Sequence, residues 1–98
     1  MMYALAIIRY RRPLDEVLTV TDEHRAYLRT LQDQGILLAS GALDPRTGGA
    51  LLLRVADGNV QETLDRIRDG DPYVQKGMGQ YELLPWNVGL GKETLDRA

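Results

Sequence analysis

The chain has 98 residues, enough for one domain with one hydrophobic core. It contains no cysteine and a single histidine, His24, which excludes a disulfide framework, a thiolate nucleophile and a cysteine and histidine cluster for zinc or iron. Its 12 Lys and Arg residues against 14 Asp and Glu residues give a net charge of -2, which argues against binding to nucleic acid.

The first strand is predicted over residues 2–10, where both alternating sets of side chains are apolar. One set contains Met2, Ala4, Ala6 and Ile8, and the other contains Tyr3, Leu5 and Ile7. Such a composition is typical of a strand that is buried on both faces. Residues 11–20 carry charges and Pro13 without a clear period, which indicates a long connection with room for a short helical turn.

The first long helix is predicted over residues 21–34, with Thr21 or Asp22 as its N-cap and Gly35 as its end. Its buried face follows the helical period and consists of Tyr27, Leu28 and Leu31.

Two further strands are predicted over residues 36–43 and 50–56. The residues between them, 44–49, contain one proline and two glycines, which suit the turn of a hairpin. We therefore expect these two strands to pair antiparallel.

The second long helix is predicted to begin at Asn59, with Glu62 three residues later as a variant of the capping box, and to end at Gly70. Its apolar stripe consists of Val60, Leu64 and Ile67. Residues 71–74 favour an irregular or one-turn helical stretch, and residues 78–86 favour the last strand. The tail that follows is predicted to be loosely held.

This order of elements, β-α-β-β-α-β, predicts an α+β fold of the ferredoxin-like type with both long helices on one face of the sheet. Residues 1–98 form a single domain in this interpretation, with its core over residues 3–86 and a C-terminal tail over residues 87–98. We expect a second copy of the chain to cover the other sheet face in a two-fold homodimer. The first strand would contribute Met2, Ala4, Ala6 and Ile8 to this interface. Four polar strand residues would line a pocket between subunits: Ser40, Arg54, Gln80 and Glu82. Glu82 would also be the partner of Arg54.

Topology brings two polar residues from distant segments to one end of the sheet. The start of the first long helix and the end of the second share that end, which places His24 close to Asp71. His24 precedes Leu28 by four residues and therefore lies on the buried stripe. It is either a core histidine that anchors the helix or an acid-base imidazole that a carboxylate orients. Asp71 before Pro72 is explained more simply as a helix cap, although one carboxylate can do both if its two oxygens face different ways.

Three further residues are candidates for binding a substrate at this end. Arg9 can bind a carboxylate through its guanidinium group, whereas the neighbouring Arg11 and Arg12 fit a solvated charge cluster. Ser40 is either a hydroxyl donor to a ligand or a strand serine with an internal partner. Tyr73 fits a core position, and it also suits an aromatic wall for a flat ligand.

Four segments of the chain together resemble the YciI-like (YCII-related) family of small bacterial proteins. They are residues 18–28 (LTVTDEHRAYL), 34–43 (QGILLASGAL), 71–78 (DPYVQKGM) and 81–86 (YELLPW). The resemblance covers residues 3–86 and rests on the order and spacing of the segments. Family patterns usually carry proline after the Ser-Gly pair, where this chain has Ala42.

The resemblance implies a ferredoxin-like α+β fold, two copies of which form a dimeric α/β barrel. It also implies an active cleft around a histidine and an aspartate, which match His24 and Asp71 in this chain. Some members of the family act on chlorinated or hydroxylated aromatic compounds by lyase-type chemistry.

Residues and resemblance together predict a His24–Asp71 acid-base site that acts on a small organic molecule by lyase or isomerase chemistry. Asp71 would accept the Nδ1 proton of His24, and Arg9, Ser40 and Tyr73 would bind the substrate, with no metal or organic cofactor. The main alternative is a non-catalytic dimeric protein, either ligand-binding or accessory, in which the pair only ties two helices together. A cofactor-free monooxygenase is less well supported, because no residue specifies oxygen chemistry.

We expect no contact with a membrane, because the longest apolar runs fall well short of the roughly 20 residues of a membrane helix. These runs are residues 3–8 and 36–39. The first residues also lack the pattern of a signal peptide, so a cytoplasmic location is predicted.

Overall fold

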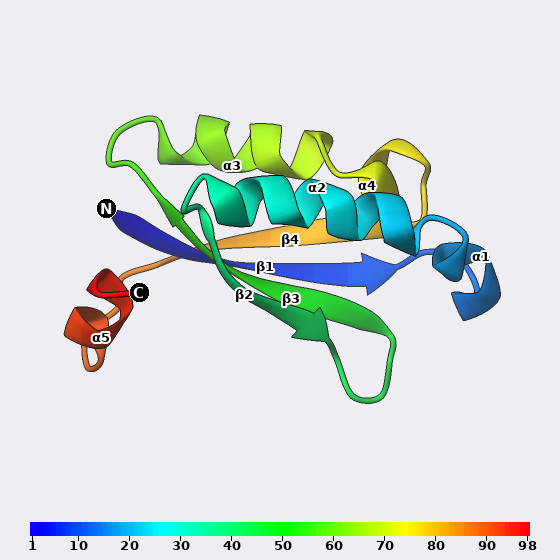
Figure 1. Ribbon diagram of the computed structural model, residues 1–98, viewed down its shortest axis with the longest axis horizontal. Coiled ribbons are helices and arrows are strands. Elements are labelled where there is room, and N and C mark those ends of the chain that lie inside the picture. Colours follow the sequence, from blue (N-terminus) through cyan, green and yellow to red (C-terminus); the bar gives the residue numbers. More distant parts are fainter.

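The computed structural model describes all residues from 1 to 98. In chain order the elements are β1 (Met2–Tyr10), α1 (Leu14–Leu18), α2 (Thr21–Asp33), β2 (Leu37–Ala42), β3 (Gly48–Val55), α3 (Val60–Asp69), α4 (Pro72–Gln75), β4 (Gly79–Trp86) and α5 (Lys92–Asp96). The four strands form one antiparallel sheet in the order β2-β3-β1-β4. Helices α2 and α3 lie on the same side of this sheet (Figure 1), which confirms the predicted ferredoxin-like α+β fold.

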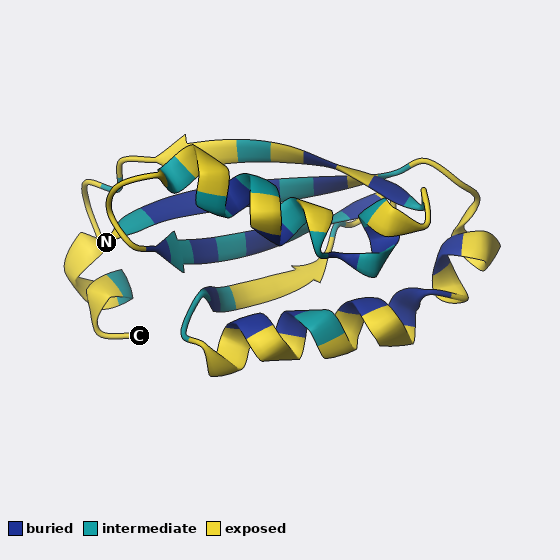
Figure 2. Cartoon of the chain, turned by 90° about the horizontal axis from the view of Figure 1, so that it is seen from above, coloured by how far each residue is buried: buried dark blue, intermediate teal, exposed yellow.

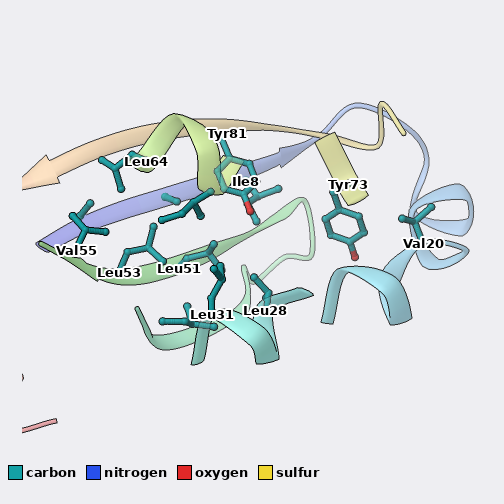
Figure 3. Packing of buried hydrophobic residues seen from close by; sticks show 14 of the residues in the cluster. Ile8, Val20, Leu28, Leu31, Leu51, Leu53, Val55, Leu64, Tyr73 and Tyr81 are labelled. Carbon is teal, nitrogen blue, oxygen red and sulfur yellow. The ribbon is translucent and has the colours of Figure 1, made fainter. Parts of the chain in front are cut away.

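The hydrophobic core fills the layer between these two helices and the sheet (Figure 3). Each helix turns one apolar stripe toward the sheet, and Figure 2 shows the buried stripes beside exposed outer faces. Helix α2 contributes Leu28 and Leu31, and α3 contributes Leu64 and Ile67. The strands contribute Ala4, Ala6, Ile8, Leu37, Leu51, Leu53, Val55 and Tyr81.

The set of β1 side chains expected at the dimer interface faces the helices instead. Ala4, Ala6 and Ile8 are at most 1% exposed and belong to the core under the helices, so their predicted place at a subunit interface is wrong. The set that begins with Tyr3 faces the other side of the sheet. Partners in the neighbouring strands extend this second face, which we call the open face: Leu5, Ile7, Arg9, Leu52, Arg54, Gln80, Glu82, Leu84 and Trp86.

The long helices lie where the apolar periods predict them. Asn59 is the N-cap of α3, as predicted, whereas the predicted N-cap of α2, Thr21 or Asp22, is wrong. Val20 is the N-cap of α2, and the hydroxyl of Thr21 donates instead to the carbonyl of Val17 in α1. Because α1 ends just before α2, the Thr21 hydroxyl is used in the contact between the two helices. Asn59 caps α3 with a left-handed φ of 50° and makes no side-chain hydrogen bond to the helix.

The C-terminal tail is more ordered than predicted. It forms α5 beside the beginning of β1, at the end of the molecule that holds both termini (Figure 1). The hydroxyl of Tyr3 donates to Asp96, and Arg54 Nη1 donates to the carbonyl of Leu95 at 3.1 Å. The predicted pair of Arg54 with Glu82 is therefore wrong, because α5 supplies the acceptor for Arg54. None of the helices is long and apolar enough to cross a membrane.

Candidate functional site

The candidate site lies at the end of the sheet next to α1 and α4, opposite the chain termini (Figure 1). His24 occupies the first turn of α2, and Asp71 stands between α3 and α4. Asp71 is the N-cap of α4, and its Oδ1 accepts a hydrogen bond from the backbone N–H of Tyr73 at 2.9 Å. The fold thus holds both predicted residues on helix termini that face one another.

The predicted contact between His24 and Asp71 is present. His24 Nδ1 lies 2.8 Å from Oδ1 and 2.9 Å from Oδ2 of Asp71. The Asp71 carboxylate has no solvent exposure, and it also accepts a hydrogen bond from the hydroxyl of Tyr81. Three donors from α2, α4 and β4 therefore satisfy a fully buried carboxylate. Capping and contact with the histidine are not alternatives here, because one carboxylate does both.

Tyr73 fixes the plane of the imidazole ring. The two rings stack with centroids 3.9 Å apart and an angle of 9° between their planes. The hydroxyl of Tyr73 lies 2.7 Å from Thr21 Oγ1, which donates its own proton to the carbonyl of Val17. The Tyr73 hydroxyl is consequently the donor to Thr21. A polar contact at one edge and a stacked face hold the tyrosine against the histidine.

The second imidazole nitrogen of His24 is accessible. Nε2 makes no hydrogen bond to another residue of the chain, whereas no buried side-chain nitrogen or oxygen is left without a partner. Nε2 must therefore reach solvent. With Nδ1 held by Asp71, the ring presents one free nitrogen to whatever occupies the space in front of it.

Burial controls the protonation of the two tyrosines beside the pair. Burial raises the pKa of Tyr81 far above its ordinary value, and the negative charge of Asp71 raises it further. Burial also raises the pKa of Tyr73. Both hydroxyls are therefore protonated donors at neutral pH.

A cavity of about 240 Å³ opens in front of His24. One wall comes from the start of α2 with Tyr73 and the end of β1, and the other wall comes from the β2–β3 hairpin. The lining residues that carry a polar side chain are Tyr10, Thr21, His24, Arg25, Ser40, Arg46 and Tyr73. Apolar residues of both walls complete the lining: Ile8, Leu28, Ala42, Ala50 and Leu51.

The structure brings three of the five predicted site residues to this cavity. His24, Ser40 and Tyr73 line it, and Asp71 lies directly behind His24. Arg9 does not join them, because its side chain leaves β1 on the open face. There Arg9 Nη2 lies 3.3 Å from Glu82 Oε1, and both side chains are more than half exposed.

Sequence reasoning missed several residues of the site. Tyr81 had a usable signal, since a tyrosine at an inward-facing strand position needs a partner for its hydroxyl. Tyr10 and Arg46 meet only because the hairpin turn folds back beside the end of β1, where Arg46 Nε lies 3.4 Å from the Tyr10 hydroxyl. No three His, Asp or Glu side chains come together as a metal site.

The YCII-related domain family matches residues 1–87 of the chain. No curated protein matches the sequence. Among solved structures, the chain is similar to 5-chloro-2-hydroxyhydroquinone dehydrochlorinase from Burkholderia phenoliruptrix AC1100, in complex with 2,5-dihydroxybenzoquinone, with a TM-score of 0.66. The two chains are 21% identical, and the match covers 88% of this chain and 95% of the other. At this identity the likeness shows a shared fold.

Proposed function

Because the chain belongs to the YCII-related domain family, we propose that it is an acid-base enzyme that acts on a small organic molecule through His24 and Asp71. One observation carries the proposal. His24 Nδ1 is held by a fully buried carboxylate, while Nε2 of the same ring has no partner in the chain and His24 lines a cavity. This is the arrangement in which an imidazole accepts and returns a proton near neutral pH.

In the proposed reaction, Asp71 accepts the Nδ1 proton and so fixes the tautomer whose Nε2 lone pair faces the cavity. Nε2 takes a proton from an acidic C–H or O–H bond of the substrate, and the electron pair of that bond stays on the substrate. The imidazolium that forms is stabilised by the adjacent carboxylate. Return of the proton to a different atom completes an isomerisation, whereas departure of a leaving group with its bonding pair completes an elimination.

The residues around the pair act as positioning residues in this scheme. Tyr81 and the backbone N–H of Tyr73 hold the Asp71 carboxylate in place. The stacked ring of Tyr73 limits rotation of the imidazole. Ser40 lines the opposite wall, where its hydroxyl can donate to a substrate oxygen. The named activity of the structural neighbour, a dehydrochlorinase, supports elimination as the reaction type.

The second candidate function is that of a ligand-binding or accessory protein. The observation that favours it is the burial of Asp71, whose three hydrogen bonds tie α2, α4 and β4 together. In this case His24 and Asp71 contribute to stability, and the cavity binds a ligand without transforming it.

The experiment that separates the two functions compares wild type with His24→Asn. The probes are 2,5-dihydroxybenzoquinone, chlorinated hydroquinones and hydroxybenzoates, with turnover followed by absorbance, chloride release and deuterium uptake from heavy water. An acid-base enzyme predicts turnover by wild type and a loss of at least ~100-fold in His24→Asn, with little change in melting temperature.

The ligand-binding function predicts the opposite pattern. His24→Asn would melt several degrees lower and bind the same probe with unchanged affinity, while wild type would show neither chloride release nor deuterium uptake. Ser40→Ala serves as the control for substrate binding, because it leaves the histidine pair intact and should change KM more than kcat.

The open face of the sheet supports a homodimer as part of this proposal. Leu84 and Trp86 are 40% and 42% exposed on this face, beside the half-buried Leu5 and Ile7. Arg9 and Glu82 on the same face have opposite charges. In a two-fold pair of sheets, each of these two charged groups can lie opposite the other in the second copy, so the face is complementary to itself.

A further inference from the structure

We propose that the cavity beside His24 binds a small organic anion, whose negatively charged oxygen is held by Arg46 and Arg25. This inference rests on the proposed function, because it names the class of substrate that His24 would meet. It is carried by the charges, partners and size of the cavity.

The charged side chains that line the cavity are arginines, although the chain as a whole is not basic. Two arginines, Arg25 and Arg46, are among its lining residues, and no aspartate or glutamate is. The chain has a net charge of -2, so these two cations do not belong to a generally basic surface. A concave site lined by one sign of charge attracts ligands of the other sign.

Neither arginine is neutralised by a carboxylate of the chain. The ion pairs of the structure include Arg9 and Arg68, but not Arg25 or Arg46. Arg46 makes one hydrogen bond, from Nε to the hydroxyl of Tyr10, which leaves its two terminal nitrogens without a partner. A planar guanidinium group with two free N–H donors matches the two oxygens of a carboxylate.

The two arginines also stand on opposite walls. Arg25 follows His24 directly in α2, and Arg46 lies in the turn of the facing hairpin. An anionic oxygen between them would leave the rest of the ligand beside the free nitrogen of His24. Apolar side chains such as Leu28 and Leu51 would contact that remaining part.

The size of the cavity limits the ligand. About 240 Å³ is below the roughly 300–1,000 Å³ of sites that hold drug-sized molecules. The space therefore suits one small ring or a short chain that carries a carboxylate or a phenolate.

The test measures binding of benzoate, salicylate and the neutral analogue benzamide by NMR, through the ring signals of His24 and Tyr73. We expect both anions to shift these signals at millimolar concentration and benzamide to bind at least tenfold more weakly. Arg46→Gln and Arg25→Gln should each weaken the anions at least fivefold, with less effect on benzamide. Higher salt should weaken the anions only.

Arg66→Gln is the matched control, because Arg66 is exposed on α3, outside the cavity, and loses the same charge. It should leave binding unchanged, and Arg46→Lys should retain part of the affinity. The inference is overturned if neither anion binds at 10 mM, if benzamide binds as well as benzoate, or if Arg46→Gln and Arg25→Gln behave like Arg66→Gln.

His24→Asn separates this inference from the proposed function. Anion binding that survives in His24→Asn, together with unchanged turnover in that variant, would contradict the acid-base role and leave the anion site standing. Turnover that depends on His24 without any preference for anions would contradict the anion site and leave the acid-base role standing.

Discussion

Asp71 shows how much a single carboxylate can be required to do in a small domain. It is the N-cap of α4, contacts the imidazole of His24 and accepts a hydrogen bond from the hydroxyl of Tyr81. It has no access to solvent. Each donor compensates part of the cost of burying a charge. Removing the Tyr81 hydroxyl without replacing it should therefore cost more free energy than losing a hydrogen bond between two neutral groups.

Tyr81→Phe tests this expectation at the buried carboxylate. The change removes a donor to a charged acceptor and should lower the free energy of unfolding by about 1.5–3 kcal/mol. In a domain of this size, that corresponds to roughly 10 °C in Tm. Thermal unfolding followed by circular dichroism measures it.

The control is Tyr27→Phe, which removes a hydrogen bond of 2.7 Å to the neutral backbone carbonyl of Ile67. Its cost should be smaller, about 1 kcal/mol. Equal losses in the two variants would mean that the Tyr81 hydroxyl does not compensate the buried charge.

At the scale of elements, one glycine sets how closely α2 and α3 pack. Gly70 follows α3 with φ of -81°, a conformation that any residue adopts, so backbone freedom does not explain it. A Cβ at this position would lie 2.7 Å from the hydroxyl of Tyr27 in α2. Gly70 is therefore needed for close approach, and the hydrogen bond from Tyr27 to Ile67 depends on that approach.

Gly70→Ala should lower the free energy of unfolding by about 1–3 kcal/mol, because the added methyl group displaces Tyr27. Without this contact, alanine in such a conformation would be stabilising by about 0.4–1 kcal/mol. The double variant with Tyr27→Phe should cost less than the sum of the two single variants, as measured by urea denaturation. Strict additivity would rule out the contact as the cause.

Most elements could be predicted from the sequence because their signal is periodic. The apolar stripes of α2 and α3 and the alternation in β4 depend only on neighbours in the chain. The cap position at Asn59 could be predicted, but the role of Thr21 and the absence of a side-chain hydrogen bond from Asn59 could not, since both depend on the adjoining segment. At the site, topology alone predicted that His24 meets Asp71.

The remaining parts of the site depend on the spatial relation of elements that local patterns do not encode. Arg9 and the interface set on β1 were assigned to the wrong faces because both alternating sets of that strand are apolar. Such a strand does not reveal which side the helices cover. The position of Arg46 depends on how the hairpin turn folds back, which neither spacing nor period indicates.

At the scale of the whole molecule, three partly or fully buried tyrosines make stability sensitive to alkaline pH. Burial raises the pKa of Tyr27, Tyr73 and Tyr81 above the ordinary value of 10.0. Above about pH 10 the unfolded chain loses these phenolic protons while the folded chain retains them. The stability is thus fully present below pH 10 and falls as the pH rises from there toward the folded-state pKa values.

The free energy of unfolding should fall by up to about 1.4 kcal/mol per pH unit for each tyrosine. Urea denaturation between pH 9 and 11 measures it. Tyr81→Phe should show a shallower decline than wild type, because one of the three groups no longer titrates. Parallel curves for the two proteins would mean that Tyr81 titrates alike in the folded and unfolded chains.

The proposed homodimer gives a second prediction at this scale. Ile7→Glu would place an unpaired carboxylate on the open face, where a second copy would desolvate it, and should weaken dimerisation at least ~100-fold. Sedimentation velocity at micromolar concentration should then show a folded monomer of 11.0 kDa. Ala6→Glu should unfold the chain instead, because Ala6 lies in the core. A wild-type chain that sediments as a stable monomer would refute the dimer.

The two walls of the cavity differ in how they are encoded. Every hairpin residue in the lining falls within residues 40–51, a continuous stretch that joins the edge strand β2 to its neighbour β3. The facing wall, by contrast, depends on contacts between His24, Asp71 and Tyr81, which are far apart in the chain. Exchange of the hairpin turn could alter ligand choice while the proton-transfer groups stay in place. The fold is therefore modular, with a replaceable recognition segment beside an arrangement of interdependent residues.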